Sequence, residues 1–197
     1  MHLNVHNEIE LKQWEAMRAG NEQAFAWLYD RYFKLLYNYG KKIGTTDAAL
    51  EDGIHDLFVD LWRFRSSLSS TTSVRFYLYR SLRRRLMRND SRSNFFTADG
   101  SIIEDALKAA TPSSEQELID EENNKQRIYR LKKLLSDLSP RQYEALVLRY
   151  YDEMSFDEIA AILNVNEQSA RNLVQRGLLQ LRHYAKYVIG LLVFLFF

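Results

Sequence analysis

The segment Leu138–Arg182 carries three closely spaced signals for the start of a helix, and these constrain the fold more than any other part of the chain. Two of the signals are capping boxes, in which a serine is followed three residues later by Gln or Glu: Ser139 with Gln142, and Ser155 with Glu158. In such a box each side chain satisfies a backbone N–H group that the first turn of a helix leaves without a partner. The pattern therefore predicts helices that begin at about residues 140 and 156.

The third signal is Asn166, which is a favourable cap for one more helix. Only the turn 164–166 separates this helix from the one before it, and a turn this short holds two helices at a sharp angle. Ala160 is small where the two helices must approach closely. This is the pattern of a helix-turn-helix, a motif that places its second helix in the major groove of DNA.

The last helix of the motif, from Glu167 to Arg182, has one apolar and one polar side. The apolar or small residues recur at helical spacing: Ala170, Leu173, Val174, Gly177, Leu178 and Leu181. The opposite side carries Gln168, Ser169, Arg171, Asn172, Gln175 and Arg176. Arg, Asn and Gln pair bidentately with base edges, Ser suits phosphate, and no acidic residue follows Glu167 on this helix. We expect these six side chains to face DNA; the alternative is an ordinary amphipathic helix with a solvated polar face.

Composition favours an all-α chain. Only two prolines and seven glycines occur in 197 residues, and a hydrophobic content of 46% is ample for packed cores. The chain has no cysteine, which excludes disulfides and thiolate metal sites and suits a reducing cytoplasm. Its first residues lack the basic stretch and apolar run of a signal peptide. We therefore expect a helical protein of the cytoplasm.

The motifs of the common enzyme classes do not occur in the sequence. It has no Gly-rich phosphate loop, no paired-His zinc motif and no nucleophile elbow. Its four histidines are scattered, and the carboxylates of Glu51, Asp52 and Asp56 are interpreted as one face of a helix rather than an acid–base pair. We therefore expect no enzymatic activity, no cofactor and no metal site.

The formal net charge of +1 hides an uneven distribution along the chain. Seven arginines crowd one short segment: Arg75, Arg80, Arg83, Arg84, Arg85, Arg88 and Arg92. Acidic residues then accumulate around a lone Lys108: Asp99, Glu104, Asp105, Glu115, Glu117, Asp120, Glu121 and Glu122. Clustered arginines are typical of nucleic-acid binding, and an acidic stretch with few aromatics is typical of a linker. We expect two small helical domains, 1–92 and 114–187, joined by an acidic linker at 93–113.

The N-terminal domain is expected to hold four helices, which share apolar residues at helical spacing: Glu8–Ala19, Asn21–Gly40, Asp47–Phe64 and Val74–Asn89. A Ser- and Thr-rich loop at 66–73 separates the last two, because these side chains satisfy their own backbone and compete with a helix. The last helix mixes aromatic residues with arginines, as single-stranded DNA requires, since the charge follows the backbone while a ring stacks on an unpaired base. The alternative is that the apolar side chains of this helix lie in the core, and we expect a core position for Phe76 and Leu78.

Four segments, in this order, resemble parts of bacterial sigma factors of the two-domain, extracytoplasmic-function (ECF) type of the sigma-70 family. Gly20–Tyr32 resembles the opening helix of region two, and Ala49–Trp62 resembles the segment that binds the β′ clamp coiled coil of RNA polymerase. Tyr77–Leu86 resembles the helix that helps to melt and read the minus-ten element. Leu138–Arg182 is similar to region four, which reads the minus-thirty-five element and packs on the β-flap. The resemblance implies a protein that binds core RNA polymerase and directs promoter recognition and transcription initiation.

Transferred position by position, the resemblance implies roles for particular side chains. Contact with the clamp falls to Glu51, Asp52, Asp56, Phe58 and Trp62. The loop at 66–73 corresponds to the one that captures a flipped base of the non-template strand, which selects Ser69, Ser70 and Thr71. The resemblance implies contact with DNA near the melted junction for Tyr77, Arg80, Arg83 and Arg84.

The chain departs from the family pattern in the fourth helix. Tyr77 stands where the family usually has Trp, and Ser81-Leu82 replaces the usual Ile-Ala pair. Arg84 and Arg88 stand where Asn and Asp are common. Additional arginine strengthens a grip that does not depend on sequence, so promoter choice that rests partly on another DNA-targeting protein is one hypothesis. A helix-turn-helix regulator that acts without core polymerase is another.

The final segment, 188–197, is an uninterrupted apolar run, V-I-G-L-L-V-F-L-F-F. Spanning a bilayer takes about twenty apolar residues, so this run is too short. Three interpretations stay open: it packs on region four of its own chain, on a partner such as the flap or a membrane-anchored anti-sigma protein, or on a membrane surface.

Overall fold

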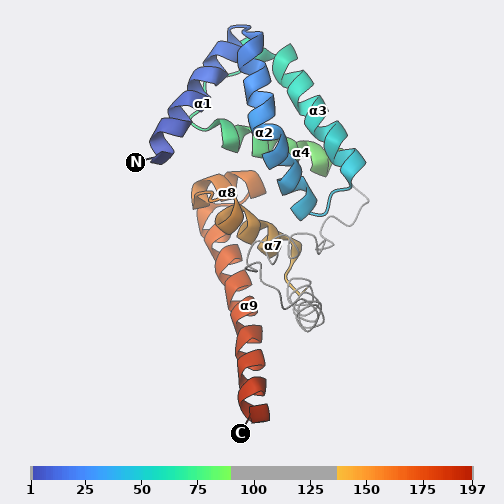
Figure 1. Cartoon of the computed structure of the whole chain (residues 1–197), viewed down its shortest axis with the longest axis vertical. Coiled ribbons are helices and arrows are strands. Elements are labelled where there is room, and N and C mark those ends of the chain that lie inside the picture. The colour runs from blue at the N-terminus through green and yellow to red at the C-terminus, as the bar shows by residue number, and fades with distance from the viewer. Residues whose placement is uncertain (1, 90–136, 197) are drawn as a thin grey trace, which may run out of the picture. The chain divides into compact units, whose positions relative to one another are not determined.

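A computed structural model describes residues 2–89 and 137–196, with side chains for 7–88 and 137–182 (Figure 1). Every regular element in these ranges is helical, which confirms the all-α prediction for the described part of the chain. The chain divides into two compact units, one built from the N-terminal helices and one from the C-terminal helices. The linker expected at 93–113 and the domain start expected at 114 lie outside the described residues.

The N-terminal unit contains α1 (His2–Arg18), α2 (Glu22–Lys42), α3 (Asp47–Arg63), the short 3-10 turn η1 (Arg65–Ser67) and α4 (Val74–Asn89). All four predicted helices are present, and α1 begins at His2 rather than Glu8. Asn21 caps α2, because its Oδ1 accepts from the backbone N of Ala24 at 3.0 Å. The chain reaches this cap through Gly20, whose φ of +94° is costly for any other residue.

The prediction that the second helix ends at Gly40 is wrong, because α2 continues to Lys42. Gly40 serves packing instead: a Cβ there would lie 2.2 Å from Leu50 Cδ1, so the missing side chain lets α3 approach α2. The core of this unit is built from large side chains of all four helices, including Trp14, Leu28, Ile54 and Leu78. Leu78 is therefore a core residue as predicted, whereas Phe76 is only half-buried.

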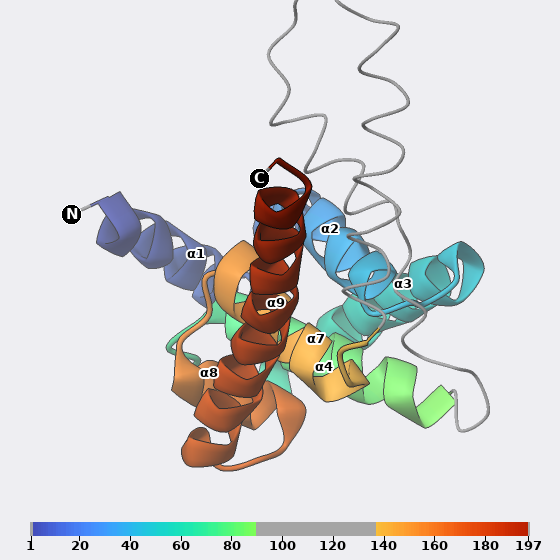
Figure 2. The same ribbon diagram turned by 90° about the horizontal axis from the view of Figure 1, so that it is seen from below.

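The C-terminal unit contains α7 (Pro140–Leu146), a π-helical turn η2 (Val147–Tyr151), α8 (Phe156–Leu163) and α9 (Glu167–Phe196). Both α7 and α8 pack on the first part of α9, as Figures 1 and 2 show. Gly177 lets α9 lie close to α7, since a Cβ there would lie 2.8 Å from Leu146 Cδ1. Ala160 of α8 is buried, and α8 packs on α9.

All three predicted helix caps of this unit are confirmed. The Ser139 and Ser155 hydroxyls accept from the backbone N of Gln142 and Glu158, and both return bonds to the serine N measure 2.9 Å. Asn166 Oδ1 accepts from the N of Ser169 at 2.7 Å. The turn between α8 and α9 passes through Asn164 in the left-handed conformation, with φ of +54°. The helix-turn-helix is therefore fixed by its own side chains.

The helix α9 continues through the apolar segment as far as Phe196, well beyond Arg182. The side chains from residue 183 onward lie outside the described set, and with them the question of what the segment packs on. Within the described residues, no helix combines the length and the hydropathy that crossing a bilayer requires.

Candidate nucleic-acid and partner interfaces

The first candidate surface is the solvent side of α3. Asp52, Asp56 and Val59 follow one another at helical spacing, and all three are exposed. Two aspartates of this side, Asp56 and Asp60, form ion pairs with Arg85 of α4. This pairing fixes α3 against α4 and partly neutralises the acidic row, which leaves Glu51 and Asp52 at its more exposed end.

The aromatic members of this surface differ in their exposure. Trp62 is half-buried: its ring lies 5.0 Å from the ring of Phe25, and the Arg65 guanidinium lies 4.3 Å above it. Phe58 is only 2% exposed and packs edge-on against Phe25 and Tyr29. The assignment of Phe58 as a surface contact is therefore wrong; it belongs to the core and supports the surface from beneath.

Sequence reasoning missed two exposed apolar residues here, Val59 and Phe64, which are 48% and 49% exposed. A signal for Val59 was present, because it stands three positions after Asp56 and thus on the acidic rather than the apolar side. Large apolar side chains rimmed by charge are typical of a protein-binding surface.

The second candidate surface is the loop between η1 and α4. Ser69 and Ser70 are exposed, as a base-capturing role requires. Thr71 is half-buried, and its hydroxyl is used within the loop, where it donates to the Ser73 carbonyl at 3.1 Å and accepts from the Ser73 N at 3.2 Å. Ser73 in turn caps α4 by accepting from the N of Phe76 at 3.2 Å. Thr71 therefore shapes the loop rather than offering its hydroxyl to a base.

The third candidate surface is the basic side of α4. Arg80, Arg84 and Arg88 are exposed and follow one another at intervals of four residues, so they form one stripe. Arg88 was not among the predicted contacts, although its spacing from Arg84 is the signal that identifies it. Arg83 is half-buried, and Tyr77 is half-buried with its ring 4.9 Å from the ring of Trp14.

The fourth candidate surface is the polar side of α9. Gln168, Arg171, Gln175 and Arg176 are exposed, while Ser169 and Asn172 are half-buried. The opposite side of α9 is buried in the core of the C-terminal unit and includes Ala170, Val174 and Gly177. Leu178, predicted for the apolar stripe, is 40% exposed, because it lies at the edge of that stripe.

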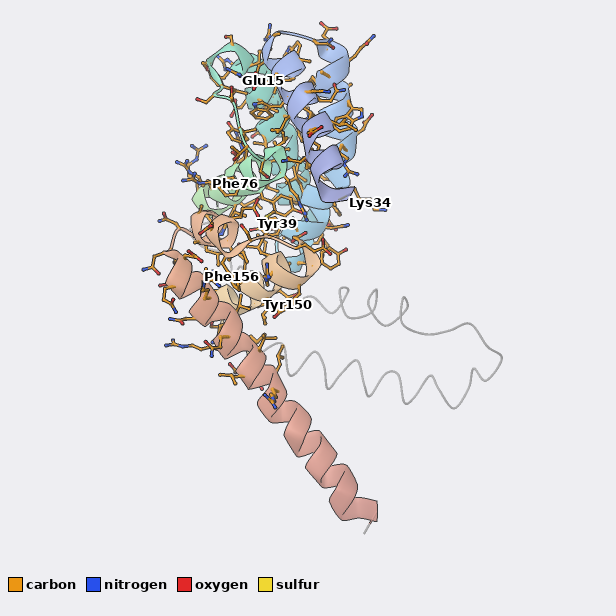
Figure 3. All side chains as sticks on the ribbon, turned by 90° about the vertical axis from the view of Figure 1, so that its left-hand side faces the viewer. Glu15, Lys34, Tyr39, Phe76, Tyr150 and Phe156 are labelled. Atoms are coloured by element: carbon orange, nitrogen blue, oxygen red, sulfur yellow. The ribbon has the colours of Figure 1, made fainter. Side chains whose placement is uncertain are left out.

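Several side chains on this surface form hydrogen bonds with one another. Gln168 Nε2 donates to Asn172 Oδ1 at 3.1 Å, and Arg171 Nε donates to Glu167 Oε1 at 2.9 Å. The hydrogen bonds from Arg171 hold the pKa of Glu167 below its ordinary value, so this carboxylate is ionised at neutral pH. Arg171 also lies over the ring of Phe156 of α8, a residue that sequence reasoning did not select and that Figure 3 labels.

Among the described residues, no group of three or more His, Asp or Glu side chains is arranged to hold a metal ion. The four surfaces offer cations, amides, hydroxyls and aromatic rings. Such groups suit the recognition of DNA and protein.

The comparisons with known families match both units. The model of the family described as Sigma-70 region 2 matches residues 28–94, and that of Sigma-70, region 4 matches residues 126–181. A search of curated proteins gives no match.

Solved structures show the same fold. CnrH, solved in complex with the cytosolic domain of CnrY, is 18% identical with a TM-score of 0.63, and the match covers 90% of this chain and 97% of that one. The sigma factor RpoE, solved in complex with the anti-sigma factor NepR from Bartonella quintana, is 20% identical with a TM-score of 0.53. That match covers 82% of this chain and 96% of the other.

Proposed function

The chain belongs to the sigma-70 family. From this premise we propose that it is an ECF-type sigma factor that directs transcription initiation, and that its two units divide the work. The N-terminal unit binds core RNA polymerase through α3 and engages the minus-ten element through the loop and α4. The C-terminal unit reads the minus-thirty-five element through α9. The protein contributes binding rather than chemistry, and it acts with the polymerase in the cytoplasm.

The observation that carries this proposal is the exposed polar side of α9. Arg171 and Gln175 stand one turn apart on a helix whose start is fixed by the Asn166 cap and whose opposite side is buried. Arg and Gln at this spacing can reach neighbouring base edges in the major groove, where each well-placed pair contributes about 1–3 kcal/mol of discrimination. A solvated helix face without a nucleic-acid role would not need this set of donors beside a capped helix start.

We assign the minus-ten element to the N-terminal unit because this unit carries the exposed arginines of α4. The stripe of Arg80, Arg84 and Arg88 can follow a phosphate backbone, and the exposed hydroxyls of Ser69 and Ser70 lie in the loop that precedes α4. Extruding a base costs a few kcal/mol, which contacts in a pocket must offset. The arginines supply affinity for any sequence, and the loop supplies selectivity.

Core polymerase is assigned to the exposed side of α3. Glu51 and Asp52 provide negative charge, and Val59, Trp62 and Phe64 provide apolar surface close to it. This combination is complementary to a coiled coil that bears arginines, since aromatic anchors with a charged rim are typical of protein interfaces. The β-flap is the second polymerase contact that we assign, to the C-terminal unit.

We also propose an anti-sigma protein as a regulatory partner. CnrH and RpoE, which share the fold of this chain, were each solved in complex with a partner, named as the anti-sigma factor NepR in the case of RpoE. Such a partner would cover the surfaces that bind polymerase and so prevent initiation. This partner could be anchored in a membrane. A separate DNA-targeting protein that assists promoter choice is a further part of the proposal.

The experiment that tests the proposal is transcription in vitro with purified core polymerase, followed by mapping of the start sites. We expect comigration with core on a sizing column and initiation from a defined set of promoters. A chain that binds DNA but neither comigrates with core nor supports initiation would instead be a helix-turn-helix regulator that acts alone.

A further inference from the structure

The helix α1 is joined to the loop between η1 and α4 by hydrogen bonds that span 50 to 65 residues of sequence. Arg18 Nε donates to the Leu68 carbonyl at 2.7 Å, and Trp14 Nε1 donates to the Ser69 carbonyl at 3.3 Å. Asn7 Nδ2 donates to the Thr72 carbonyl at 3.4 Å. One helix therefore satisfies three backbone acceptors of a loop that has few backbone partners of its own.

Arg18 makes a second contact in the same loop. Its Nη1 donates to the Ser70 hydroxyl at 3.1 Å and also forms an ion pair with Glu15, one turn earlier on α1 (Figure 3 labels Glu15). The guanidinium is planar and presents its donors in a fixed fork. Bonded at once to Leu68, Ser70 and Glu15, it fixes both the loop backbone and the direction of one loop side chain.

Trp14 connects this arrangement to α4. It is completely buried, and its ring meets the ring of Tyr77 edge-on at 4.9 Å. The loop, α1 and the aromatic residue at the start of α4 are thus parts of one packed arrangement. The Ser69 and Thr72 side chains remain exposed, although their carbonyls are held by α1.

We propose that α1 is a positioning element for minus-ten recognition, in which Arg18 and Trp14 set the selectivity of the loop for the base it captures. The inference rests on the proposed role of the loop in base capture. Its physical reason is preorganisation: a loop held in one conformation does not lose further conformational entropy when the base enters. A loop released from Arg18 and Trp14 would adapt to several bases and bind each of them less well.

The test uses the full chain assembled with core polymerase, and the variant Arg18→Met. Methionine keeps an apolar stem and removes every donor. The matched control is Lys12→Met, which removes an exposed cation of the same helix outside this set of contacts. Open-complex formation is measured on promoters in which each position of the non-template minus-ten strand carries each of the four bases in turn, or an abasic site.

For Arg18→Met we expect open-complex formation on the preferred promoter to fall roughly three- to tenfold, because both hydrogen bonds from Arg18 to the loop are lost. The preference at one non-template position should flatten. With an abasic site at that position, the wild type and the variant should form open complexes equally well, which a merely structural role would not produce. Arg18→Lys, which keeps the charge but replaces the planar fork of donors by a single ammonium group, should show an intermediate preference, and Lys12→Met should behave as the wild type.

An unchanged base preference in folded Arg18→Met overturns the proposal, as does an equal loss on all templates, the abasic one included. If Arg18→Met does not fold, Trp14→Phe decides, because it keeps a buried aromatic ring while it removes the donor to Ser69 and part of the ring volume. Wild-type preference in folded Trp14→Phe would then overturn the proposal. Failure of the underlying premise looks different: the wild type itself would show no base preference at any minus-ten position.

Discussion

The guanidinium of Arg171 lies over the ring of Phe156, 4.4 Å from the ring centroid, and so links the N-terminal part of α9 to the first turn of α8. Arg149 lies over the same ring at 4.8 Å and donates to the Met154 carbonyl at 2.8 Å. Stacking on a ring at a partly exposed site stabilises a cation by about 0.5–1 kcal/mol. The orientation of a side chain proposed to read DNA is therefore set before DNA arrives.

The pairing of Glu167 with Arg171 leads to the first prediction. The carboxylate is ionised at neutral pH, so it competes with DNA for the guanidinium and repels nearby phosphates. Glu167→Gln should strengthen binding to promoter DNA by roughly threefold and make it more dependent on salt. Fluorescence anisotropy of the holoenzyme with labelled promoter at several salt concentrations measures both effects. Glu153→Gln, an exposed acidic residue before α8, is the control and should change little.

The second prediction separates sequence-specific recognition of DNA from binding that does not depend on sequence. Arg171→Ala or Gln175→Ala should change which minus-thirty-five sequences are preferred, by about 1–3 kcal/mol for each lost base contact. Arg84→Ala should instead weaken binding to every sequence and lower its salt dependence. Selection from a randomised upstream element gives the preferences. Uniform loss of affinity in all three variants would show that α9 does not read bases and would favour recruitment by another DNA-binding protein.

The third prediction concerns core polymerase. Asp52 is exposed, whereas Asp56 is paired with Arg85 and helps to hold α3 on α4, so Asp52→Arg tests the surface without breaking that pair. We expect association with core to weaken at least tenfold, or about 1.4 kcal/mol, with an unchanged melting curve. Glu8→Arg on α1 reverses an exposed charge elsewhere and should leave binding unchanged. Equal affinity of Asp52→Arg and the wild type for labelled core would remove this assignment.

The fourth prediction uses the ion pair that joins the end of α2 to the start of α3. Asp47 accepts from Lys41 Nζ at 2.8 Å and from the Tyr37 hydroxyl at 2.7 Å, and these bonds hold its pKa below the ordinary 3.8. Because the pKa is lower in the folded state, the carboxylate stabilises the fold above pH 3.8, and this contribution is lost as the pH falls through the depressed value.

Asp47→Asn should therefore melt at a lower temperature than the wild type at pH 7. The difference should shrink as the pH falls below 3.8. Thermal melts at pH 7, 4 and 2.5 check this, with Asp30→Asn, an exposed aspartate of α2, as the control. A difference that does not depend on pH would mean that the pair with Lys41 contributes nothing measurable.

The fifth prediction tests the close approach of α2 and α3 at Gly40. An alanine there would meet Leu50 at 2.2 Å, so Gly40→Ala should destabilise the N-terminal unit by about 1–3 kcal/mol despite the better helix propensity of alanine. Leu50→Ala removes the atoms that clash, so Gly40→Ala should cost less in the Leu50→Ala background than in the wild type, although Leu50→Ala is itself destabilising because it empties part of the core. Chemical denaturation of the two single variants and the double variant gives the coupling, and strictly additive effects would contradict the assignment.

The features that could be predicted from the sequence are local ones. The capping residues Ser139, Ser155 and Asn166 act within three positions of themselves, so their spacing alone identified the helix starts. Phe58 was assigned to the clamp surface by the family resemblance alone, whereas its spacing from Ile54 and Leu61 places it on the apolar side of α3, where it is buried. Gly40 was taken as a helix end because only the packing of another helix reveals its role.

The relationships that could not be predicted join residues far apart in the chain. The bonds from α1 to the loop between η1 and α4 depend on the packing of the whole N-terminal unit. The pairing of Arg85 with Asp56 and Asp60 separates it from the exposed arginines of α4, although all of them look alike in the sequence. Phe156 gave no signal because its contact with Arg171 crosses the turn between two helices.

The length of α9 has a mechanical consequence. Thirty residues at about 1.5 Å per residue make a rod of roughly 45 Å, with Arg171 and Gln175 near one end and the apolar segment at the other. An unbroken helix transmits rotation and tilt along its whole length. A partner bound at the far end of α9 would therefore change the orientation of Arg171 and Gln175, the residues proposed to read the promoter, without contacting them.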